Sequence, residues 1–184
     1  MKYIIFILIL FYPLNILASS KQLIKNKLEE TDNISFKFIQ KIGKKTEKGE
    51  CIISYPKKIF CKYDDIYNKI LVSNGRSLVI NSKKIKNYLR YQLKDTPLNL
   101  ILDKKFLLDK LDKVEIIQEN DETFYFEIIH NNNLLNIFFD KTSYEIKGWI
   151  TTDIYQNRVE TRLFNIKANI MINEKTFRFQ MYIN

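Results

Sequence analysis

The chain has 184 residues, a formal net charge of +9, and only four glycines, two cysteines and one histidine. Its length suits a single domain, and no glycine-rich phosphate loop, HExxH, CxxC or nucleophile-elbow motif is present. The lysines are spread along the chain, which favours a compositional bias over a nucleic-acid site and leaves attraction to an anionic membrane surface open.

The N-terminal residues 1–19 have the pattern of a secretory signal peptide. Lys2 supplies a positive charge, residues 3–17 form an apolar core, and Ala18-Ser19-Ser20 provides the small residues of a cleavage zone. A membrane anchor is the alternative, but the apolar run contains Pro13 and is shorter than the ~20 residues that a span needs. We therefore expect cleavage after residues 18–20, export, and one mature domain over residues 20–184.

The mature chain begins with an amphipathic helix over residues 22–30 and then alternates like β-strands. In the first strand, Phe36, Phe38 and Gln40 share one face. Because hairpins connect the strands and no βαβ unit is present, the pattern predicts one antiparallel sheet that curls on itself. Later strands are expected near residues 85–91, 114–118, 124–129, 134–140, 144–153, 158–170 and 177–182.

The two cysteines flank a turn centred on Pro56, which places Cys51 and Cys61 opposite each other on adjacent antiparallel strands. Export would bring them into an oxidising compartment, so a structural disulfide is favoured. Two buried thiols are the alternative. A metal site is not expected, because nothing nearby completes a ligand set.

Residues 70–111 are the most informative part of the chain. Two apolar runs flank Asn74-Gly75, and this dipeptide between such runs predicts a β-hairpin over residues 70–80. A short apolar helix follows at residues 96–102, with Asp95 or Thr96 as its cap and Pro97 at its first position. Asp103 can cap a second short helix. A sheet interrupted by small apolar helices indicates a lid over a concave apolar surface.

Candidate catalytic residues are scarce. His130 is the one histidine and stands beside three asparagines at a turn, where a structural role is expected. The carboxylates fall in turns or on polar faces, and nothing points to a catalytic pair. We therefore expect a protein that is not an enzyme and that uses neither a metal nor a cofactor.

In their order and spacing, these segments resemble the periplasmic outer-membrane lipoprotein carrier proteins of the LolA family. The similar segments are Ser35 to Gln40, Gly49, Tyr55-Pro56, Tyr63, Ile70 to Leu78 and Thr96 to Leu98. The C-terminal part of the chain is similar in length and strand pattern alone.

The resemblance implies a mainly β (α+β) fold: an incomplete, strongly curled antiparallel β-barrel with short helices forming a lid over an apolar cavity. It also implies a monomeric periplasmic carrier that binds the acyl chains of lipoproteins and delivers them to the outer membrane. The expected partners are acylated lipoproteins, an inner-membrane lipoprotein-releasing ABC transporter and an outer-membrane lipoprotein acceptor, and not nucleic acid.

The same resemblance suggests the residues of the cavity. In the family, an arginine just before the proline of the second hairpin holds lid and barrel together. Tyr55 stands at that position here, and its hydroxyl can bond to the lid backbone but cannot make the multidentate contacts of a guanidinium. The residues expected to line the cavity are Phe36, Phe38, Ile59, Tyr63, Leu98, Ile101, Leu102 and Phe106, and for each of them ordinary core packing is the alternative.

Two other functions remain open. The same fold could serve as an envelope sensor of lipids or lipoproteins, or as a carrier of another amphiphile. Alternatively, the chain could be a protein-interaction module whose basic surface meets acidic partners.

Overall fold

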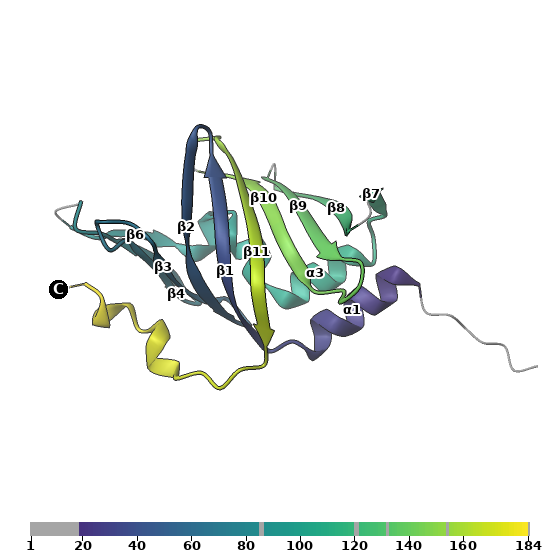
Figure 1. Cartoon of the computed structure of the whole chain (residues 1–184), viewed down its shortest axis with the longest axis horizontal. Helices are drawn as coiled ribbons and strands as arrows, with labels where there is room; N and C mark the ends of the chain where they lie inside the picture. Colours follow the sequence, from purple (N-terminus) through teal and green to yellow (C-terminus); the bar gives the residue numbers. More distant parts are fainter. Residues whose placement is uncertain (1–18, 85–86, 120–121, 132, 154, 184) are drawn as a thin grey trace, which may run out of the picture.

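The computed structural model describes residues 19–84, 87–119, 122–131, 133–153 and 155–183, so residues 1–18 of the predicted signal peptide lie outside the described residues. Within these ranges the chain forms one sheet of eleven strands in the order β6-β5-β4-β3-β2-β1-β11-β10-β9-β8-β7 (Figure 1). The strands are β1 (Asn33–Ile42), β2 (Lys45–Ser54), β3 (Lys58–Tyr63), β4 (Ile70–Asn74), β5 (Ser77–Asn81), β6 (Leu89–Gln92), β7 (Ile116–Glu119), β8 (Thr123–His130), β9 (Asn133–Asp140), β10 (Ile146–Thr152) and β11 (Arg158–Ala168).

The sheet consists of two antiparallel meanders, β1 to β6 and β7 to β11, which the pairing of β1 with β11 joins in the middle. The two outermost strands are β6 and β7, and they do not pair with each other. The predicted curled antiparallel sheet is therefore confirmed, and it is an open sheet that does not close into a barrel.

Helices lie against the concave side of this sheet. Ser19 caps α1 (Ser20–Glu30) by accepting a hydrogen bond from the backbone N–H of Gln22. The segment between β6 and β7 contains η1 (Leu93–Asp95), α2 (Leu98–Leu102) and α3 (Lys104–Leu111), and Asp103 caps α3 as predicted. Helices α1 and α3 pack together and are linked by an ion pair between Lys25 and Asp112. In the described part of the chain, no helix has the length and hydrophobicity needed to cross a membrane.

The main core fills the space between these two helices and β8, β9 and β10. Ile24 and Leu107 from the helices and Phe126, Ile137 and Phe139 from the sheet have no exposed surface. Because alternate residues of a strand point to the same face, these strands contribute every second side chain to this core. We call this region the packed half of the molecule.

The Asn74-Gly75 hairpin is confirmed. Gly75 has φ +96°, a left-handed conformation that glycine adopts without steric cost. The side-chain oxygen of Asn74 accepts hydrogen bonds from the backbone N–H groups of Arg76 and Ser77. The turn is thus stabilised locally and fixes the register of β4 against β5.

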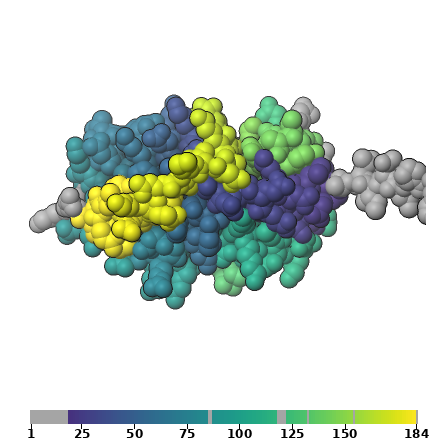
Figure 2. Space-filling view, turned by 90° about the horizontal axis from the view of Figure 1, so that it is seen from below, coloured from purple at the N-terminus to yellow at the C-terminus, as the bar shows by residue number. Residues whose placement is uncertain are grey.

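The strand predicted near residues 177–182 is wrong. After β11 the chain turns at Asn169 and forms two short helices, η2 (Glu174–Phe177) and η3 (Phe179–Met181). β11 already pairs with β1 on one edge and with β10 on the other, so the segment that follows it finds no free sheet edge there. Phe179 instead packs on the outer face of the sheet against Val72 and Val79. Figures 1 and 2 show this C-terminal segment in yellow, outside the sheet.

Candidate ligand-binding cavity

A cavity of about 380 Å³ lies on the concave side of the sheet, beside the packed half. Strands β1 to β6 form most of its wall, β10 and β11 complete it, and α2 covers it. We call the part of the sheet made of β3 to β6, with the α2 lid, the open half of the molecule. The volume falls within the ~300–1,000 Å³ range of small-molecule sites.

The floor of the cavity is apolar and aromatic. Phe36 meets Trp149 edge-on, with 6.3 Å between ring centroids, and Phe38 meets Tyr63 in the same way at 5.1 Å. A Cβ atom at Gly49 would lie 2.9 Å from the Phe38 ring and 2.2 Å from a backbone oxygen, so glycine is required for this packing. The remaining apolar wall residues are Ile42, Ile59, Leu71, Leu78, Ile80, Leu89, Tyr91 and Val159.

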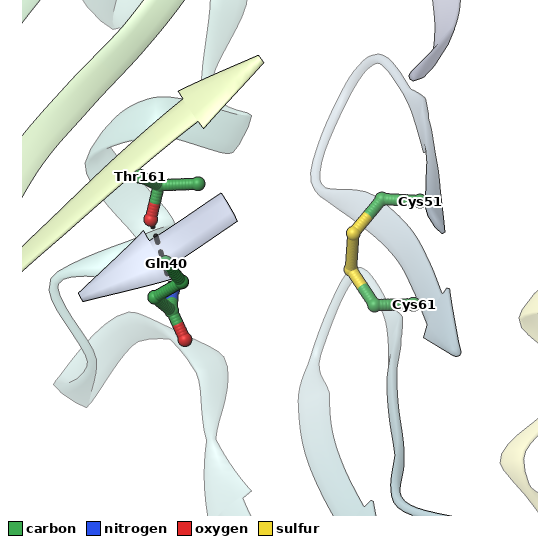
Figure 3. The surroundings of a disulfide bond; sticks show 4 residues. All are labelled: Gln40, Cys51, Cys61 and Thr161. Atoms are coloured by element: carbon green, nitrogen blue, oxygen red, sulfur yellow. Dashed lines mark hydrogen bonds between the residues drawn. A yellow bond between two sulfur atoms is a disulfide. The ribbon is translucent and has the colours of Figure 1, made fainter. Parts of the chain in front are cut away.

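The disulfide between Cys51 and Cys61 belongs to the same wall. The two residues are directly opposed on β2 and β3, and Figure 3 shows the sulfur bridge between these strands. Because the bridge carries no charge or strong hydrogen-bonding group, it extends the apolar surface. It also fixes the register of β3 against β2.

One end of the cavity is polar. There, Gln40 donates a hydrogen bond from Nε2 to Oγ1 of Thr161 at 2.9 Å, and the two residues face each other from β1 and β11 in Figure 3. Glu47 accepts a hydrogen bond from Nζ of Lys69 at 2.6 Å. The Lys69 ammonium also lies 3.6 Å from the centroid of the Tyr63 ring. Along the inner face of β1, Gln40 therefore follows Phe36 and Phe38 and is succeeded by Ile42, so the cavity has an aromatic region and a region with hydrogen-bonding groups.

The charges at this polar end are perturbed by their partial burial. Burial opposes the ionisation of Glu47, but hydrogen bonds from Lys45 and Lys69 outweigh it and hold the pKa of this carboxyl below its ordinary value. Burial lowers the pKa of Lys69, although the adjacent Glu47 partly offsets the effect. Burial also raises the pKa of the Tyr63 hydroxyl, with Glu47 contributing. The polar end therefore holds an ionised Glu47 carboxylate that is hydrogen-bonded to Lys69.

The lid is attached to the β2–β3 hairpin through Lys57. Its backbone N–H donates to the carbonyl of Leu102 at 2.8 Å, and its ammonium lies 3.0 Å from the Asp103 carboxylate. Lys104, which follows, donates to the backbone carbonyls of Glu29 and Thr31 at the end of α1. The end of α2 is therefore tied to the sheet on one side and to α1 on the other.

Tyr55 lies in this region but makes no hydrogen bond to the lid. Its hydroxyl oxygen is buried without a hydrogen-bond partner in the described part of the chain, and burial raises its pKa. The Tyr55 ring packs against the main core, 5.8 Å from the ammonium of Lys104. The contacts that the sequence led us to expect from Tyr55 are provided by Lys57, two residues later.

The structure brings six of the eight expected lining residues together around the cavity: Phe36, Phe38, Ile59, Tyr63, Leu98 and Ile101. The other two lie elsewhere. Leu102 is fully buried in the main core, and Phe106 packs against the His130 ring, 5.0 Å away between centroids. The short α2 helix turns Leu98 and Ile101 toward the cavity, while Leu102 faces the packed half.

Sequence reasoning missed Trp149 and Leu78, which line the cavity, and Lys57, which contacts the end of the lid. Because side chains alternate between the two faces of a strand, the pattern along β10 and β5 could have indicated Trp149 and Leu78. Lys57 carried no such signal, because its role depends on where the lid ends. Among the described residues, no group of three or more His, Cys, Asp or Glu side chains is placed to hold a metal ion.

An open antiparallel sheet with an apolar cavity under a short helix suits apolar or amphipathic ligands. The family model "Outer membrane lipoprotein carrier protein LolA" matches residues 29–180. The chain therefore belongs to the LolA family, which confirms the resemblance. A sequence search of curated proteins found no match.

Two solved structures are similar to this chain, and the second, with a TM-score above 0.5, shows the fold. A LolA superfamily protein from Nitrosomonas europaea is 9% identical, with 87% of this chain and 98% of that chain covered and a TM-score of 0.44. An outer membrane lipoprotein-sorting protein domain from Vibrio parahaemolyticus is 10% identical, with 88% and 96% covered and a TM-score of 0.51. At these identities, the similarity shows the fold alone.

Proposed function

We propose that this protein carries lipoproteins through the periplasm by holding their acyl chains in the cavity. It receives them from a lipoprotein-releasing ABC transporter of the inner membrane and passes them to an acceptor at the outer membrane. The observation that supports this most is the apolar cavity of about 380 Å³ beneath α2 in a chain of the LolA family. No catalytic step is part of the proposal.

The free energy of acyl-chain burial favours such a carrier. Each methylene moved from water to an apolar site contributes about 0.8 kcal/mol, so an acyl chain needs continuous shelter while it crosses an aqueous compartment. Phe36, Phe38, Ile59 and Trp149 supply the apolar surface for this shelter. The polar end of the cavity can accommodate the ester and amide groups that adjoin the chains.

Release requires that the protein does not hold its cargo too tightly. The closed lid contacts the sheet through Leu98 and Ile101, so cargo must displace contacts that the empty protein makes with itself. The energy needed to open the lid is subtracted from the energy of binding. The Lys57–Asp103 ion pair contributes to this closed state, and we assign to it the role expected of the residue before Pro56.

The test is capture of a purified triacylated lipoprotein. The full mature protein is mixed with the lipoprotein in detergent, the detergent is removed, and soluble complexes are measured by native mass spectrometry. The proposal predicts a one-to-one complex with the acylated form and none with the enzymatically deacylated form.

A matched pair of variants locates the binding site. Leu98→Glu places a carboxylate in the cavity, whereas Leu134→Glu places one on the outer face of β9, where the leucine is 40% exposed. Capture should be lost in the first variant and retained in the second. Binding of free fatty acid without any lipoprotein capture would indicate carriage of another amphiphile. If both variants captured the lipoprotein equally well, the acyl chains would not bind in the cavity.

A further inference from the structure

The outer face of the sheet, opposite the cavity, is strongly basic where β11, β1, β2 and β3 run side by side. In these strands alternate residues point outward, and the outward positions include Lys37, Lys41, Lys48, Lys62 and Lys167, all of them exposed. Within the described residues none of these five lysines forms an ion pair. We call this surface the basic face.

Acidic residues on the basic face do not balance these charges. Glu50 lies between Lys37 on β1 and Lys62 on β3 in the register of the sheet. Glu160 on β11 is already paired with Arg158 and Arg162, with N–O distances of 2.8 Å to each. A surface with this excess of cations attracts an anionic partner and repels a basic one.

A groove of about 600 Å³ crosses the basic face. Apolar residues form part of its wall, with Ile52 and Phe60 directly opposed on β2 and β3. Lys37 and Lys167 line it as well. In the sheet, the row of Ile52 and Phe60 lies two residues along the strands from the row of Lys37, Glu50 and Lys62. One row therefore holds Lys37 and Lys62 on either side of Glu50, which also lines the groove, and the adjacent row is apolar.

The dimensions of this surface fit a short extended peptide. Four neighbouring strands span three inter-strand spacings of ~4.8 Å, or about 15 Å, which roughly four to five extended residues cover. An extended peptide places alternate side chains on opposite edges. A peptide that crosses the strands would direct acidic side chains toward Lys37 and Lys62 and apolar side chains toward Ile52 and the part of Phe60 that Tyr182 leaves uncovered.

A flat lipid surface fits the same place less well. The C-terminal segment stands on the outer face of the neighbouring strands, where Phe179 packs on Val72 and Val79 and Tyr182 packs on Phe60. Figure 2 shows this segment in yellow on the surface of one part of the molecule, over blue and teal atoms of the first half of the chain. Because Tyr182 packs on Phe60, which lines the groove, the segment stands on the outer face beside the groove, and a peptide can lie along it more readily than a flat bilayer.

We infer that the basic face is a docking site for an extended, acidic segment of a partner protein in which acidic and apolar residues alternate. This site is on the other side of the sheet from the cavity and does not depend on the proposed carrier function. A partner bound there leaves the cavity and its lid accessible.

The experiment measures the binding of a fluorescein-labelled decapeptide of alternating Glu and Val by fluorescence anisotropy. The full mature protein should bind this peptide, and binding should weaken as salt rises. A Gln-Val decapeptide, which lacks the charge, should bind at least about fivefold more weakly.

Two double variants with the same change of charge provide the comparison. The double variant Lys37→Gln/Lys62→Gln removes two cations of the basic face, and we expect about tenfold weaker binding. Lys105→Gln/Lys113→Gln removes two exposed lysines in and just after α3, and the effect should stay below about twofold.

Three results would overturn the inference. The first is no binding of the Glu-Val peptide, and the second is equal weakening in the two double variants, which would mean attraction to net charge alone. The third is binding to vesicles of phosphatidylglycerol without binding to the peptide, which would assign the basic face to a membrane.

Discussion

The packed half and the open half of this molecule use the same sheet but fill it differently. In the packed half, α1 with eleven residues and α3 with eight cover β8, β9 and β10, and side chains such as Leu107 and Phe126 have no exposed surface. In the open half, α2 has five residues and covers strands of four to six residues. At ~1.5 Å per residue, α2 extends only about 7 Å across its cavity.

This difference shows how one curled sheet provides both a stable core and a binding cavity. Most inward residues of both halves are apolar, so the sequence of the strands does not distinguish the packed half from the open half. The two halves differ in the length and position of the helices that cover them. Where the cover is long, side chains from helix and sheet fill the interior, and where it is short, the wall of the sheet remains available to a ligand.

The largest expected effect tests the structural role of the packed half. Leu107→Ala should lower the free energy of unfolding by about 3 kcal/mol, because it creates a cavity in a fully buried site. Leu98→Ala in the lid should cost less than about 1 kcal/mol, because this leucine is only partly buried beside an existing cavity. Urea unfolding of both variants gives the two values. Equal losses would contradict the distinction between the halves.

The next effect concerns the disulfide in the wall of the open half. Cys51 and Cys61 are ten residues apart, and a loop of this size predicts a stabilisation of roughly 2–3 kcal/mol. The Cys51→Ala/Cys61→Ala variant should unfold at correspondingly lower urea concentration. Reductant should destabilise the native protein by a similar amount and leave the variant unchanged. Insensitivity of the native protein to reductant would show that this bond does not contribute.

A smaller effect is expected from acid in the packed half. Partial burial opposes the ionisation of Asp140, but hydrogen bonds from Lys147, Ser143 and Thr142 lower the pKa of this carboxyl to about 2. Because the folded-state pKa lies below the ordinary value of 3.8, Asp140 stabilises the fold above about pH 4 and loses this contribution as the pH falls toward 2.

Unfolding of Asp140→Asn between pH 2 and pH 6 measures this contribution. The difference from the native protein should be about 1 kcal/mol or less at pH 6, because the ion pair with Lys147 is partly exposed, and it should vanish near pH 2. A difference that grows as the pH falls would have the wrong sign.

The smallest effect on stability is expected at the lid. Lys57→Met removes the ion pair with Asp103 but keeps the backbone hydrogen bond to Leu102, so stability should fall by about 0.5 kcal/mol. The same change should increase acyl-chain affinity by about twofold, because the closed state loses a contact that the open state does not make. Titration with a fluorescent fatty acid gives the affinity. Weaker binding would contradict a role of Lys57 in closing the lid.

Much of this architecture could be predicted from the sequence. The period of two along the strands, the Asn74-Gly75 turn and the cap at Asp103 act locally, and local signals are visible in the chain. The strand expected near residues 177–182 failed because a strand needs a free edge, and the pairing of β11 on both sides depends on the whole sheet.

The cavity was harder to predict than the sheet. The alternation of side chains along the first and third strands showed which of their residues belong to the wall of the cavity. It did not show which side chains of the lid helices point toward the cavity. Leu102 and Phe106 share the apolar pattern of Leu98, yet Leu102 lies on the side of α2 that faces the main core, and α3, which begins after Asp103, places Phe106 against His130. The contact between Lys57 and Asp103 joins two turns far apart in sequence, and no local pattern marks it.

In the proposed function acyl chains enter the cavity, and Trp149 offers the most direct test. It is the one tryptophan of the chain, it lines the cavity, and it is 5% exposed. A lipopeptide with a brominated acyl chain should quench its fluorescence in a saturable way, and Leu98→Glu should abolish the quenching while Leu134→Glu preserves it. Binding of the lipopeptide with unchanged Trp149 fluorescence would contradict the account, because the acyl chain would then lie outside the cavity.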